Sequence, residues 1–326
     1  MHIGEKEIIK KIVEAYFGSE KQNTHIQAEY EYVRLTGGLT NYNYLLKINN
    51  KGSFFLKIFR KAPAKRVKAL VYISMLLQKR NFPTPHIIKP IQGDYWQEDQ
   101  YSAIITEYIT GVHPIQSEDT LHKIGNVMSV LHLLKPDKDV AETLIQSYSL
   151  NFQNRMEQMR GSKIPEELSH FIDLARPHID VIEFESFYRS IIHGDIFLDN
   201  VMVSEMNDFF FIDFEGGCID NAIFDIARAI IGCCLKYGEI DPELCKAFLF
   251  GYTLIRPLEP NEAEMIYEYI IYAGTVSALW RFTEFDLARV EENRMGIYRE
   301  LMKPTLALIK MGKKKACEDL INPAIK

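Results

Sequence analysis

Cysteine is scarce in this sequence, and the few cysteines present follow no binding pattern. There are five, an odd number, with no CxxC pair and no histidine at the spacing of a zinc ligand. Neither a disulfide-stapled fold nor a zinc finger is therefore indicated. We expect reduced, mostly buried thiols at Cys218, Cys233, Cys234, Cys245 and Cys317.

Long apolar runs and an excess of positive charge are also lacking. The most hydrophobic helical pattern, Ile270 to Phe282, contains polar and charged residues, and the start MHIGEKEIIKK has no apolar signal core. We therefore expect no membrane span and a cytoplasmic location. Lys and Arg number 38 against 44 Asp and Glu, a net charge of −6, which disfavours a general nucleic-acid binder. The hydrophobic share of 47% suffices for a sizeable core.

Strand-like and helical patterns divide the chain into two parts of different character. In the first part, aromatic and β-branched runs separated by Gly or Asn turns predict an antiparallel sheet. From Ser117 onward, long helical patterns dominate, interrupted by a strand-and-loop stretch at residues 191–217. We predict an α+β protein with a small sheet-rich N-terminal lobe (residues 1–108) and a larger, mainly helical C-terminal lobe (residues 109–326). The expected strands are Ala28–Leu35, Asn41–Ile48, Ser53–Phe59 and Ser102–Tyr108, and the expected early helices are Glu5–Phe17 and Ala64–Arg80.

The residues best suited to chemistry lie between His193 and Asp213. A carboxylate at Asp195 can accept a proton from an attacking hydroxyl or orient that hydroxyl. Asn200 offers an amide oxygen, and Asp213 offers a carboxylate directly after the apolar run FFFI. These are the hard oxygen ligands that Mg²⁺ takes when it also holds substrate phosphates. Rigid placement of such groups is most of what phosphoryl transfer requires of a protein.

This segment resembles the catalytic region of the aminoglycoside phosphotransferase and small-molecule kinase superfamily, whose members are relatives of the protein kinases with the same two-lobed fold. The family's catalytic loop reads HxDxxxxN, which His193, Asp195 and Asn200 match, and its metal-binding Asp follows on a strand, as Asp213 does. The resemblance implies a protein-kinase-like fold, ATP and Mg²⁺ as cofactors, and Asp195 as the catalytic base. It also implies Asn200 and Asp213 as metal ligands and a structural role for His193.

The same resemblance assigns nucleotide-binding positions in the N-terminal lobe. Lys57 lies in the apolar run FFLKIF, where a lone lysine is costly unless an anion meets it, and it matches the family's lysine that contacts the ATP phosphates. Gly37 and Gly38 fall in the phosphate-covering loop, where glycine lets the backbone approach a phosphate. Glu107 to Ile109 match the linker whose backbone meets the adenine.

Two further positions leave questions open. Asp225 matches an aspartate that braces the catalytic loop in relatives, but the helix dipole also favours a carboxylate at a helix start, and the sequence does not decide between the two roles. In kinases, an acid on the helix after the strand lysine holds that lysine, yet Ala64–Arg80 contains no Asp or Glu. The acid partner of Lys57 is therefore left open.

The acceptor is expected to be a small molecule with a hydroxyl group, because only about a dozen residues separate Asp213 from Asp225, too few for a peptide-docking segment. HGDIFLDN is similar to the HGDLFxDN loop of type II homoserine kinases. The IDFxxxxxDNAxxDIA pattern from Ile212 and the RPL element at residues 256–258 are also similar to that group. The resemblance makes homoserine the first candidate, with Arg281 binding its carboxylate and Asp199 and Glu215 its ammonium group.

A second resemblance points to choline or ethanolamine as the acceptor. GGLTNYNY is similar to a loop of the bacterial choline and ethanolamine kinases, and SALWRFTEF at residues 277–285 is similar to their LW-containing helix. Trp280, with Phe282, Tyr272 and Glu284, would then bind a quaternary ammonium. An aminoglycoside acceptor is a further alternative.

A degenerate kinase fold that senses nucleotide without turnover is the non-enzymatic alternative. The intact Asp195, Asn200 and Asp213 argue against it, and the missing helix acid argues weakly for it. We expect a small-molecule hydroxyl acceptor as the partner, and no nucleic acid or membrane. The sequence leaves open the oligomeric state, the number of metal ions and the choice between ATP and GTP.

Overall fold

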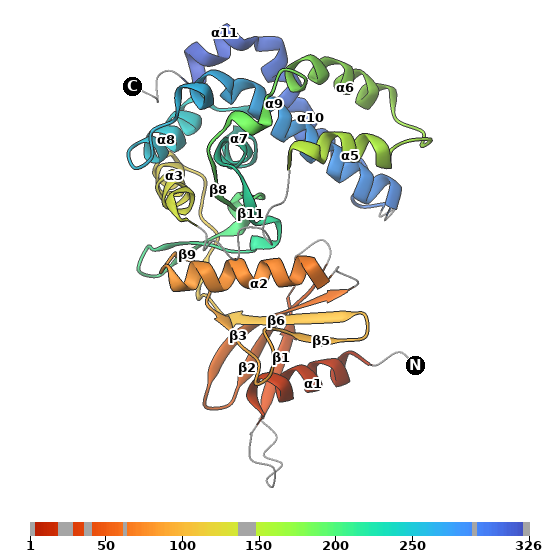
Figure 1. The fold of residues 1–326 in the computed structure, drawn as a ribbon, viewed down its shortest axis with the longest axis vertical. Coiled ribbons are helices and arrows are strands. Elements are labelled where there is room, and N and C mark those ends of the chain that lie inside the picture. Colours follow the sequence, from red (N-terminus) through yellow and green to blue (C-terminus); the bar gives the residue numbers. More distant parts are fainter. Residues whose placement is uncertain are drawn as a thin grey trace. The chain divides into compact units, whose positions relative to one another are not determined.

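The chain forms two compact units in a computed structural model (Figure 1). Unit 1 is Met1–Val112 with Met202–Glu215, and unit 2 is His113–Val201 with Gly216–Lys326. The sequence predicted a division after residue 108, whereas the structure groups residues 202–215, including Asp213, with the N-terminal part of the chain. The residues that the structure describes are 4–18, 29–35, 41–60, 64–135, 148–288 and 292–321.

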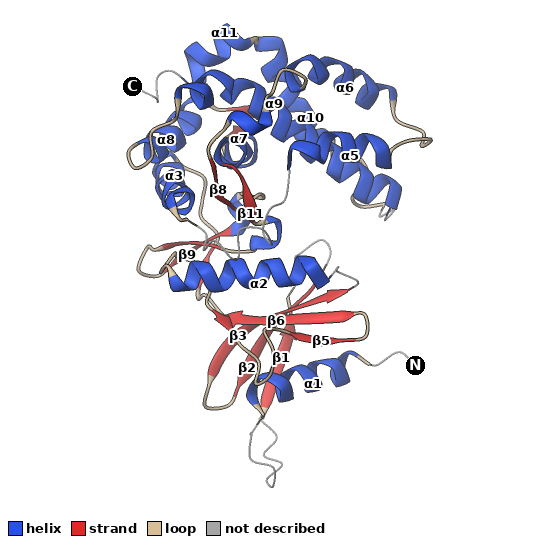
Figure 2. Ribbon diagram, viewed as in Figure 1, coloured by secondary structure: helices blue, strands red, loops and turns tan. Residues whose placement is uncertain are grey.

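An antiparallel sheet forms the centre of unit 1 (Figure 2). Its strand order is β1-β2-β3-β6-β4, and β5 pairs with β6. The four strands predicted from the sequence are confirmed, with each end within two residues of its predicted position, whereas the short strands β4 and β5 were not expected. The strands are β1 (Tyr30–Arg34), β2 (Tyr42–Ile48), β3 (Gly52–Arg60), β4 (Ile87–Ile88), β5 (Trp96–Glu98) and β6 (Tyr101–Glu107).

Two helices, α1 (Glu5–Phe17) and α2 (Ala64–Lys79), lie on opposite sides of this sheet (Figure 1). Apolar residues of α1 share one buried cluster with Leu56 and Ile58 of β3. Because side chains alternate along a strand, Lys57 points to the other face of the sheet, the side on which α2 lies. The position of Lys57 thus follows from the apolar pattern of β3.

Residues 202–215 are attached to unit 1 by strand pairing and by aromatic packing. Strand β9 (Val201–Ser204) pairs with β7 (Gly111–Val112) and with β10 (Phe209–Phe211). The Phe211 N–H donates to the carbonyl of Pro83 at 3.0 Å, and the Phe82 ring packs edge-on against Phe211 and Phe214. These contacts fix the backbone on both sides of Asp213.

Unit 2 is built around the long helix α9 (Pro260–Arg281), whose residues from Ile266 to Leu279 are all buried. A helix that is buried on every side belongs to a core, and α9 contacts α5, α6, α7 and α10. Among the described residues, no helix combines the length and the apolar character needed to cross a membrane. The other helices are α3 (Glu118–Leu133), α5 (Asn151–Gln158), α6 (Glu166–Ile179), α7 (Ala222–Cys233), α8 (Pro242–Thr253), α10 (Arg299–Met311) and α11 (Lys313–Ala316).

The predicted catalytic loop, which begins at His193, follows a strand of a two-stranded antiparallel pair. Strand β8 (Arg189–Ile192) pairs with β11 (Cys218–Asn221), with Ile192 opposite Cys218. Helix α7 begins directly after β11. The loop that leaves β8 therefore starts beside the beginning of β11, and α7 starts at the opposite end of this pair, where Asn221 lies opposite Arg189. A second short pair, β12 (Leu235–Lys236) with β13 (Glu239–Ile240), precedes α8.

Candidate active site

The predicted catalytic loop follows β8 in unit 2 and is held by the carboxylate of Asp225. Asp225 Oδ2 accepts the N–H of His193 at 2.6 Å, and Asp225 Oδ1 accepts the N–H of Gly194 at 2.7 Å. Gly194 has φ +79°, and a Cβ there would lie 2.6 Å from the carbonyl oxygen of Gly216, so the turn requires glycine. Of the two roles left open by the sequence, the structure shows that Asp225 braces the loop.

Two histidines surround the buried Asp225 carboxylate. His132 Nε2 lies 3.2 Å from Asp225 Oδ2, and both side chains are inaccessible to solvent. Burial by itself raises the pKa of Asp225, but the hydrogen bond and charge of His132, together with His193, outweigh burial and lower that pKa below its ordinary value. Asp225 is therefore an ionised buried acceptor, which suits it to hold two backbone N–H groups.

Asp195 and Asn200 are brought together within unit 2. The Asn200 side-chain amide donates to the backbone carbonyl of Asp195 at 2.7 Å, which closes the turn between them. This bond uses the NH₂ group of Asn200 and so does not involve its amide oxygen, the atom suited to a metal ion. The Asp195 side chain is 49% exposed and accepts a hydrogen bond from Arg228 Nη2 at 2.6 Å.

Lys57 of unit 1 meets two carboxylates. Its side chain is 6% exposed, and its Nζ donates to Asp213 Oδ1 at 2.8 Å and to Glu215 Oε1 at 2.6 Å. Burial alone lowers the pKa of Lys57, but the charges of Asp213 and Glu215 and their hydrogen bonds outweigh it and raise that pKa. Lys57 is therefore a buried cation, and the anionic partner expected from the sequence is this pair of acids.

Glu215 supplies the acid that α2 lacks. Besides Lys57, its carboxylate accepts from Asn41 Nδ2 at 2.7 Å and lies 3.4 Å from Arg66 Nη2, at the start of α2. The sequence assigned Glu215 to the ammonium group of an acceptor. These contacts support a different role, because they join Glu215 to the strand lysine and to its neighbours in unit 1.

Asp213 occupies a backbone conformation that is rare for a residue with a side chain. Its φ is +64°, in the left-handed region, directly after β10 and its following residue Ile212. Such conformations cost of the order of 1–3 kcal/mol and persist where the surroundings determine them. The packing around Phe211 and Phe214 provides those surroundings, and the Asp213 side chain is exposed on this turn.

The remaining nucleotide-binding predictions concern residues 37 and 38 and the residues at and after the end of β6. Gly37 and Gly38 lie outside the described residues. Glu107 ends β6, and its N–H donates to the carbonyl of His86 at 2.9 Å. That N–H already has a partner, and Ile109, two residues further on, is half-buried.

The candidate acceptor residues other than Glu215 lie in unit 2. Asp199 lies in the short 3₁₀ turn Leu198–Asn200 and is exposed. Arg281 Nη1 donates to Glu300 Oε2 at 2.7 Å, and the Arg281 guanidinium lies 6.0 Å from the ring centre of Phe197 in the catalytic loop. Arg281 therefore already has an acidic partner.

The aromatic residues proposed for a quaternary ammonium are not gathered into a cage. The Trp280 ring packs edge-on against Phe285, Phe282 packs against Tyr298, and Tyr272 packs in the core. Among the described residues, none of these ring contacts joins two of Trp280, Phe282 and Tyr272. Tyr272 and Phe282 are buried in the core, whereas Trp280 is half-buried.

Tyr148 and Arg228 border the catalytic loop and were missed from the sequence. The Tyr148 hydroxyl donates to the carbonyl of Gly216 at 2.7 Å, and its ring stacks on Phe224. Burial raises its pKa well above the usual value, so Tyr148 stays a hydrogen-bond donor. Neither residue has a motif of its own, although Arg228 lies one helical turn after Asp225, a spacing that the sequence displays.

Cys218, the thiol nearest to the predicted site, is buried in β11. Burial raises its pKa well above the usual value, and the nearby charges of Asp220 and Asp225 act in the same direction. A thiol held protonated in this way is a poor nucleophile. All five cysteines are free thiols, and all but Cys317 are buried.

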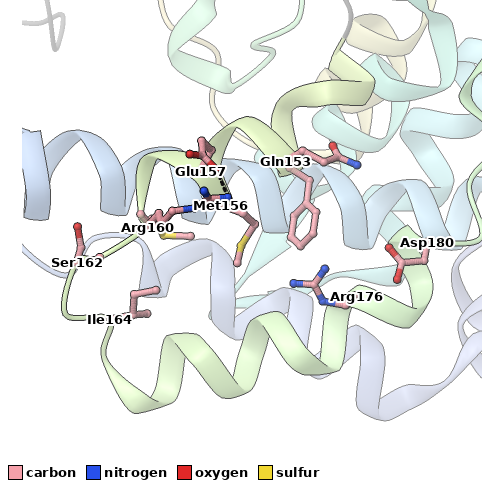
Figure 3. A pocket seen from close by; sticks show the side chains of 11 residues that line it. Gln153, Met156, Glu157, Arg160, Ser162, Ile164, Arg176 and Asp180 are labelled. Carbon is pink, nitrogen blue, oxygen red and sulfur yellow. Dashed lines mark ion pairs between the residues drawn. The ribbon is translucent and has the colours of Figure 1, made fainter.

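A pocket of about 530 Å³ lies between α5 and α6 of unit 2 (Figure 3). Its labelled side chains carry both charges, including Arg176 and Asp180 from the end of α6 and the ion pair between Arg160 and Glu157. None of the described residues that line it belongs to the predicted catalytic loop.

Asn200 and Asp213 each offer an oxygen donor of the kind that Mg²⁺ takes when it also holds phosphates. Asn200 contributes an amide oxygen and Asp213 an exposed carboxylate, and Mg²⁺ is usually held by one or two such groups plus substrate phosphate oxygens and water. Asn200 belongs to unit 2 and Asp213 to unit 1, so each unit contains one of the two expected ligands.

Comparison with known proteins places this arrangement in context. Residues 31–260 match the family model of the phosphotransferase enzyme family (APH). A homoserine kinase of Methylobacillus flagellatus is 25% identical over 244 residues, which cover 70% of this chain and 72% of that protein.

Solved structures show the same fold. Amicoumacin kinase hAmiN, in complex with AMP-PNP, Ca²⁺ and Ami, has a TM-score of 0.70 at 14% identity and covers 95% of this chain and 94% of its own. Choline kinase LicA from Streptococcus pneumoniae has a TM-score of 0.66 at 18% identity and covers 93% of this chain and 99% of its own. The predicted α+β, protein-kinase-like fold is confirmed.

Proposed function

Because the chain belongs to the phosphotransferase enzyme family and is a small-molecule kinase, we propose that it transfers the γ-phosphoryl group of ATP to the hydroxyl of homoserine. The observation that carries the proposal is the braced loop in which Asp225 holds the backbone of His193 and Gly194 and so presents the half-exposed Asp195. A phosphoryl-transfer enzyme needs an acceptor-orienting carboxylate in such a rigid setting.

In this reaction Asp195 orients the acceptor hydroxyl and takes its proton. The new bond joins the acceptor oxygen to the γ-phosphorus while the bond from that phosphorus to the β–γ bridging oxygen breaks, and ADP leaves with the electron pair. Lys57 neutralises phosphate charge. Asn200 and Asp213 would hold Mg²⁺, which, when bound, supplies further neutralisation of charge on the phosphates.

Homoserine is the proposed acceptor because sequence similarity supports it both in the catalytic loop and over most of the chain. The catalytic loop HGDIFLDN is similar to that of type II homoserine kinases, and the curated relatives with matching sequence include homoserine kinases of Methylobacillus flagellatus and Polaromonas naphthalenivorans. The dispersal of Trp280, Phe282 and Tyr272 into separate packing contacts weakens the case for choline. Choline, ethanolamine and aminoglycosides are therefore the comparison acceptors.

The proposal is tested by coupled ATP turnover with Mg²⁺ across homoserine, choline, ethanolamine, sugars and aminoglycosides. We expect saturable turnover with homoserine, and a loss of kcat of roughly 10²-fold to 10⁴-fold in Asp195→Asn, the range for removing a general base. Asp173→Asn, an exposed position on α6, is the matched control. Preferential turnover of choline or ethanolamine would reject homoserine as the acceptor. Near-normal turnover by Asp195→Asn would reject Asp195 as the base, and nucleotide binding without any turnover would favour the scaffold alternative.

A further inference from the structure

One face of helix α7 contacts the catalytic loop at three successive points. Asp225 binds the backbone of residues 193 and 194, and Arg228 binds the side chain of Asp195. At Gly232, a Cβ would lie 2.6 Å from the carbonyl oxygen of Ile196 and 2.9 Å from the Phe197 ring. The spacing 225, 228, 232 places all three residues on one helical face. The loop thus follows α7 from His193 to Phe197.

Arg228 is an unusual member of this face because it is a nearly buried cation. Its side chain is 10% exposed, and its Nη2 lies 2.6 Å from Asp195 Oδ1. Its Nε is buried and finds no hydrogen-bond partner among the described residues. The guanidinium also lies 4.7 Å from the ring centre of Phe197, two residues after Asp195. Arg228 is therefore held between the base and an aromatic side chain of the same loop.

Stability alone does not account for this arrangement. The Asp195 side chain is half-exposed, and ion pairs that reach solvent contribute little to stability. Burying a guanidinium with an unpartnered Nε opposes that small gain. The ion pair therefore has to matter for its effect on Asp195. Without Arg228, the half-exposed Asp195 side chain could change rotamer.

We propose that Arg228 is the positioning residue of the catalytic base. By holding Oδ1 it fixes the Asp195 carboxylate in one orientation and leaves Oδ2 to receive the proton of the acceptor hydroxyl. The planar guanidinium, stacked near Phe197, has the rigidity that this task requires, whereas a lysine ammonium is a single point charge on a flexible stem. The proposal rests on the assignment of Asp195 as the base in the proposed function.

The test compares Arg228→Met and Arg228→Lys with the wild type and with Arg299→Met. Arg299 pairs with Glu167 at the start of α6, so its variant removes an arginine–carboxylate pair of the same unit away from the loop. Turnover is measured with ATP, Mg²⁺ and homoserine, or with whichever acceptor of the screen is turned over. We expect Arg228→Met to lower kcat roughly 10²-fold, the cost of a misplaced catalytic group, with little change in nucleotide affinity. Arg228→Lys should recover part of that loss, and Arg299→Met should behave as the wild type.

A double-mutant cycle separates positioning from a general structural role. Because Arg228 acts through the Asp195 carboxylate, adding Arg228→Met to Asp195→Asn should lower kcat by less than threefold more, whereas an independent structural defect would multiply the two losses. The proposal would be overturned if the loss of kcat in the double variant equalled the product of the two single losses. It would also be overturned if Arg228→Met kept a kcat within threefold of the wild type. If Asp195→Asn itself retains turnover, the base assignment of the proposed function fails instead, so the two failures are distinguishable.

Discussion

Lys57 has two acids within hydrogen-bond distance, and they are suited to different tasks. Asp213 lies 2.8 Å from Lys57 Nζ and is also the carboxylate expected to bind a metal ion, whereas Glu215 lies 2.6 Å from the same nitrogen. A metal ion and a lysine compete for one carboxylate, so an acid that serves only the lysine keeps that lysine in place during nucleotide binding. Glu215 meets this need because Asn41 also holds it.

We expect Glu215→Gln to weaken binding of ATP with Mg²⁺ about tenfold, which corresponds to the loss of roughly 1.4 kcal/mol from one charge-assisted hydrogen bond. The glutamine keeps the size of the side chain but removes the charge that compensates buried Lys57. The affinity is measured by calorimetry with a non-hydrolysable ATP analogue. Glu264→Gln, an exposed position on α9, is the control. An affinity within twofold of the wild type would show that Asp213 alone positions Lys57.

The contrast between Lys57 and its partner shows what the sequence can and cannot predict at this scale. A lone lysine in an apolar strand signals a buried cation, and the absence of acids from Ala64–Lys79 is visible by inspection. The partner is 158 residues away along the chain, and no periodicity joins two residues at that separation. Glu215 was therefore assigned to the acceptor, because its neighbours in sequence were catalytic and its neighbours in space were unknown.

Helix α7 organises the catalytic loop as one element, and Asp225 in its first turn is the strongest contact. Asp225 accepts two backbone N–H groups and lies next to His132. A hydrogen-bonded chain continues from His132 through Tyr252 to Arg256, at 2.7 Å and 2.9 Å, and ends at the buried carboxylate of Glu262. These hydrogen bonds link α3, the end of α8 and the start of α9 to the predicted catalytic loop.

We expect Asp225→Asn to lower the free energy of unfolding at neutral pH by about 2–3 kcal/mol, because an amide cannot accept both N–H groups and leaves a buried donor unsatisfied. The pKa of Asp225 is lower in the folded protein than in the unfolded chain. Its stabilising contribution is therefore fully present above an ordinary aspartate pKa of about 4 and is lost as pH falls through the lower folded-state pKa. Urea unfolding of the wild type and of Asp225→Asn, from pH 7 to acidic pH, measures the difference in their free energies of unfolding.

The difference in free energy of unfolding between the wild type and Asp225→Asn should become smaller below about pH 4 and stay constant above it. Asp173→Asn, on the exposed face of α6, should show no such dependence. A difference that instead grew on acidification would mean that the folded protein holds Asp225 protonated, contrary to the bracing role.

Elements with a clear apolar period were predictable, and short ones were not. Helix α1 was predicted at its observed bounds, Glu5–Phe17, because its apolar residues recur with helical spacing. The two-residue strand β4 pairs with β6 but is too short to show alternation. The helical spacing of Asp225, Arg228 and Gly232 was present in the sequence, but its meaning depends on the loop that packs there, which no local pattern specifies.

At the scale of the whole molecule, the proposed chemistry is divided between the two units. Unit 1 contains Lys57, Asp213 and Glu215, and unit 2 contains Asp195 and Asn200. The sequence assigned Asp213 to the C-terminal lobe because it follows the catalytic loop in the chain. In the structure, Asp213 belongs to the unit that contains Lys57, because β9 pairs with β7 and Phe211 packs against Phe82. The unit that contains Asp213 thus depends on strand pairing over a long separation, which linear order does not reveal.

The proposed binding of ATP with Mg²⁺ predicts an increase in the thermal stability of the protein. A ligand that binds only the folded state stabilises it by mass action, by about 2.7 kcal/mol when its concentration is about 100 times its Kd. We therefore expect ATP with Mg²⁺ to raise the Tm of the full chain, and EDTA to remove most of that increase because Mg²⁺ then no longer links the phosphates to Asn200 and Asp213. Differential scanning fluorimetry with ATP, with and without Mg²⁺, measures both effects.

Two variants separate metal binding from acceptor activation in the same measurement. Asp213→Asn removes a proposed metal ligand, so we expect it to lose the Mg²⁺-dependent part of the Tm increase while Glu215 still holds Lys57. Asp195→Asn leaves the proposed metal ligands in place and should keep that increase although it loses turnover. Equal Mg²⁺-dependent increases in the wild type and Asp213→Asn would exclude Asp213 as a metal ligand. Loss of the increase in Asp195→Asn would instead assign Asp195 to the metal, because a residue that only activates the acceptor has no effect on nucleotide binding.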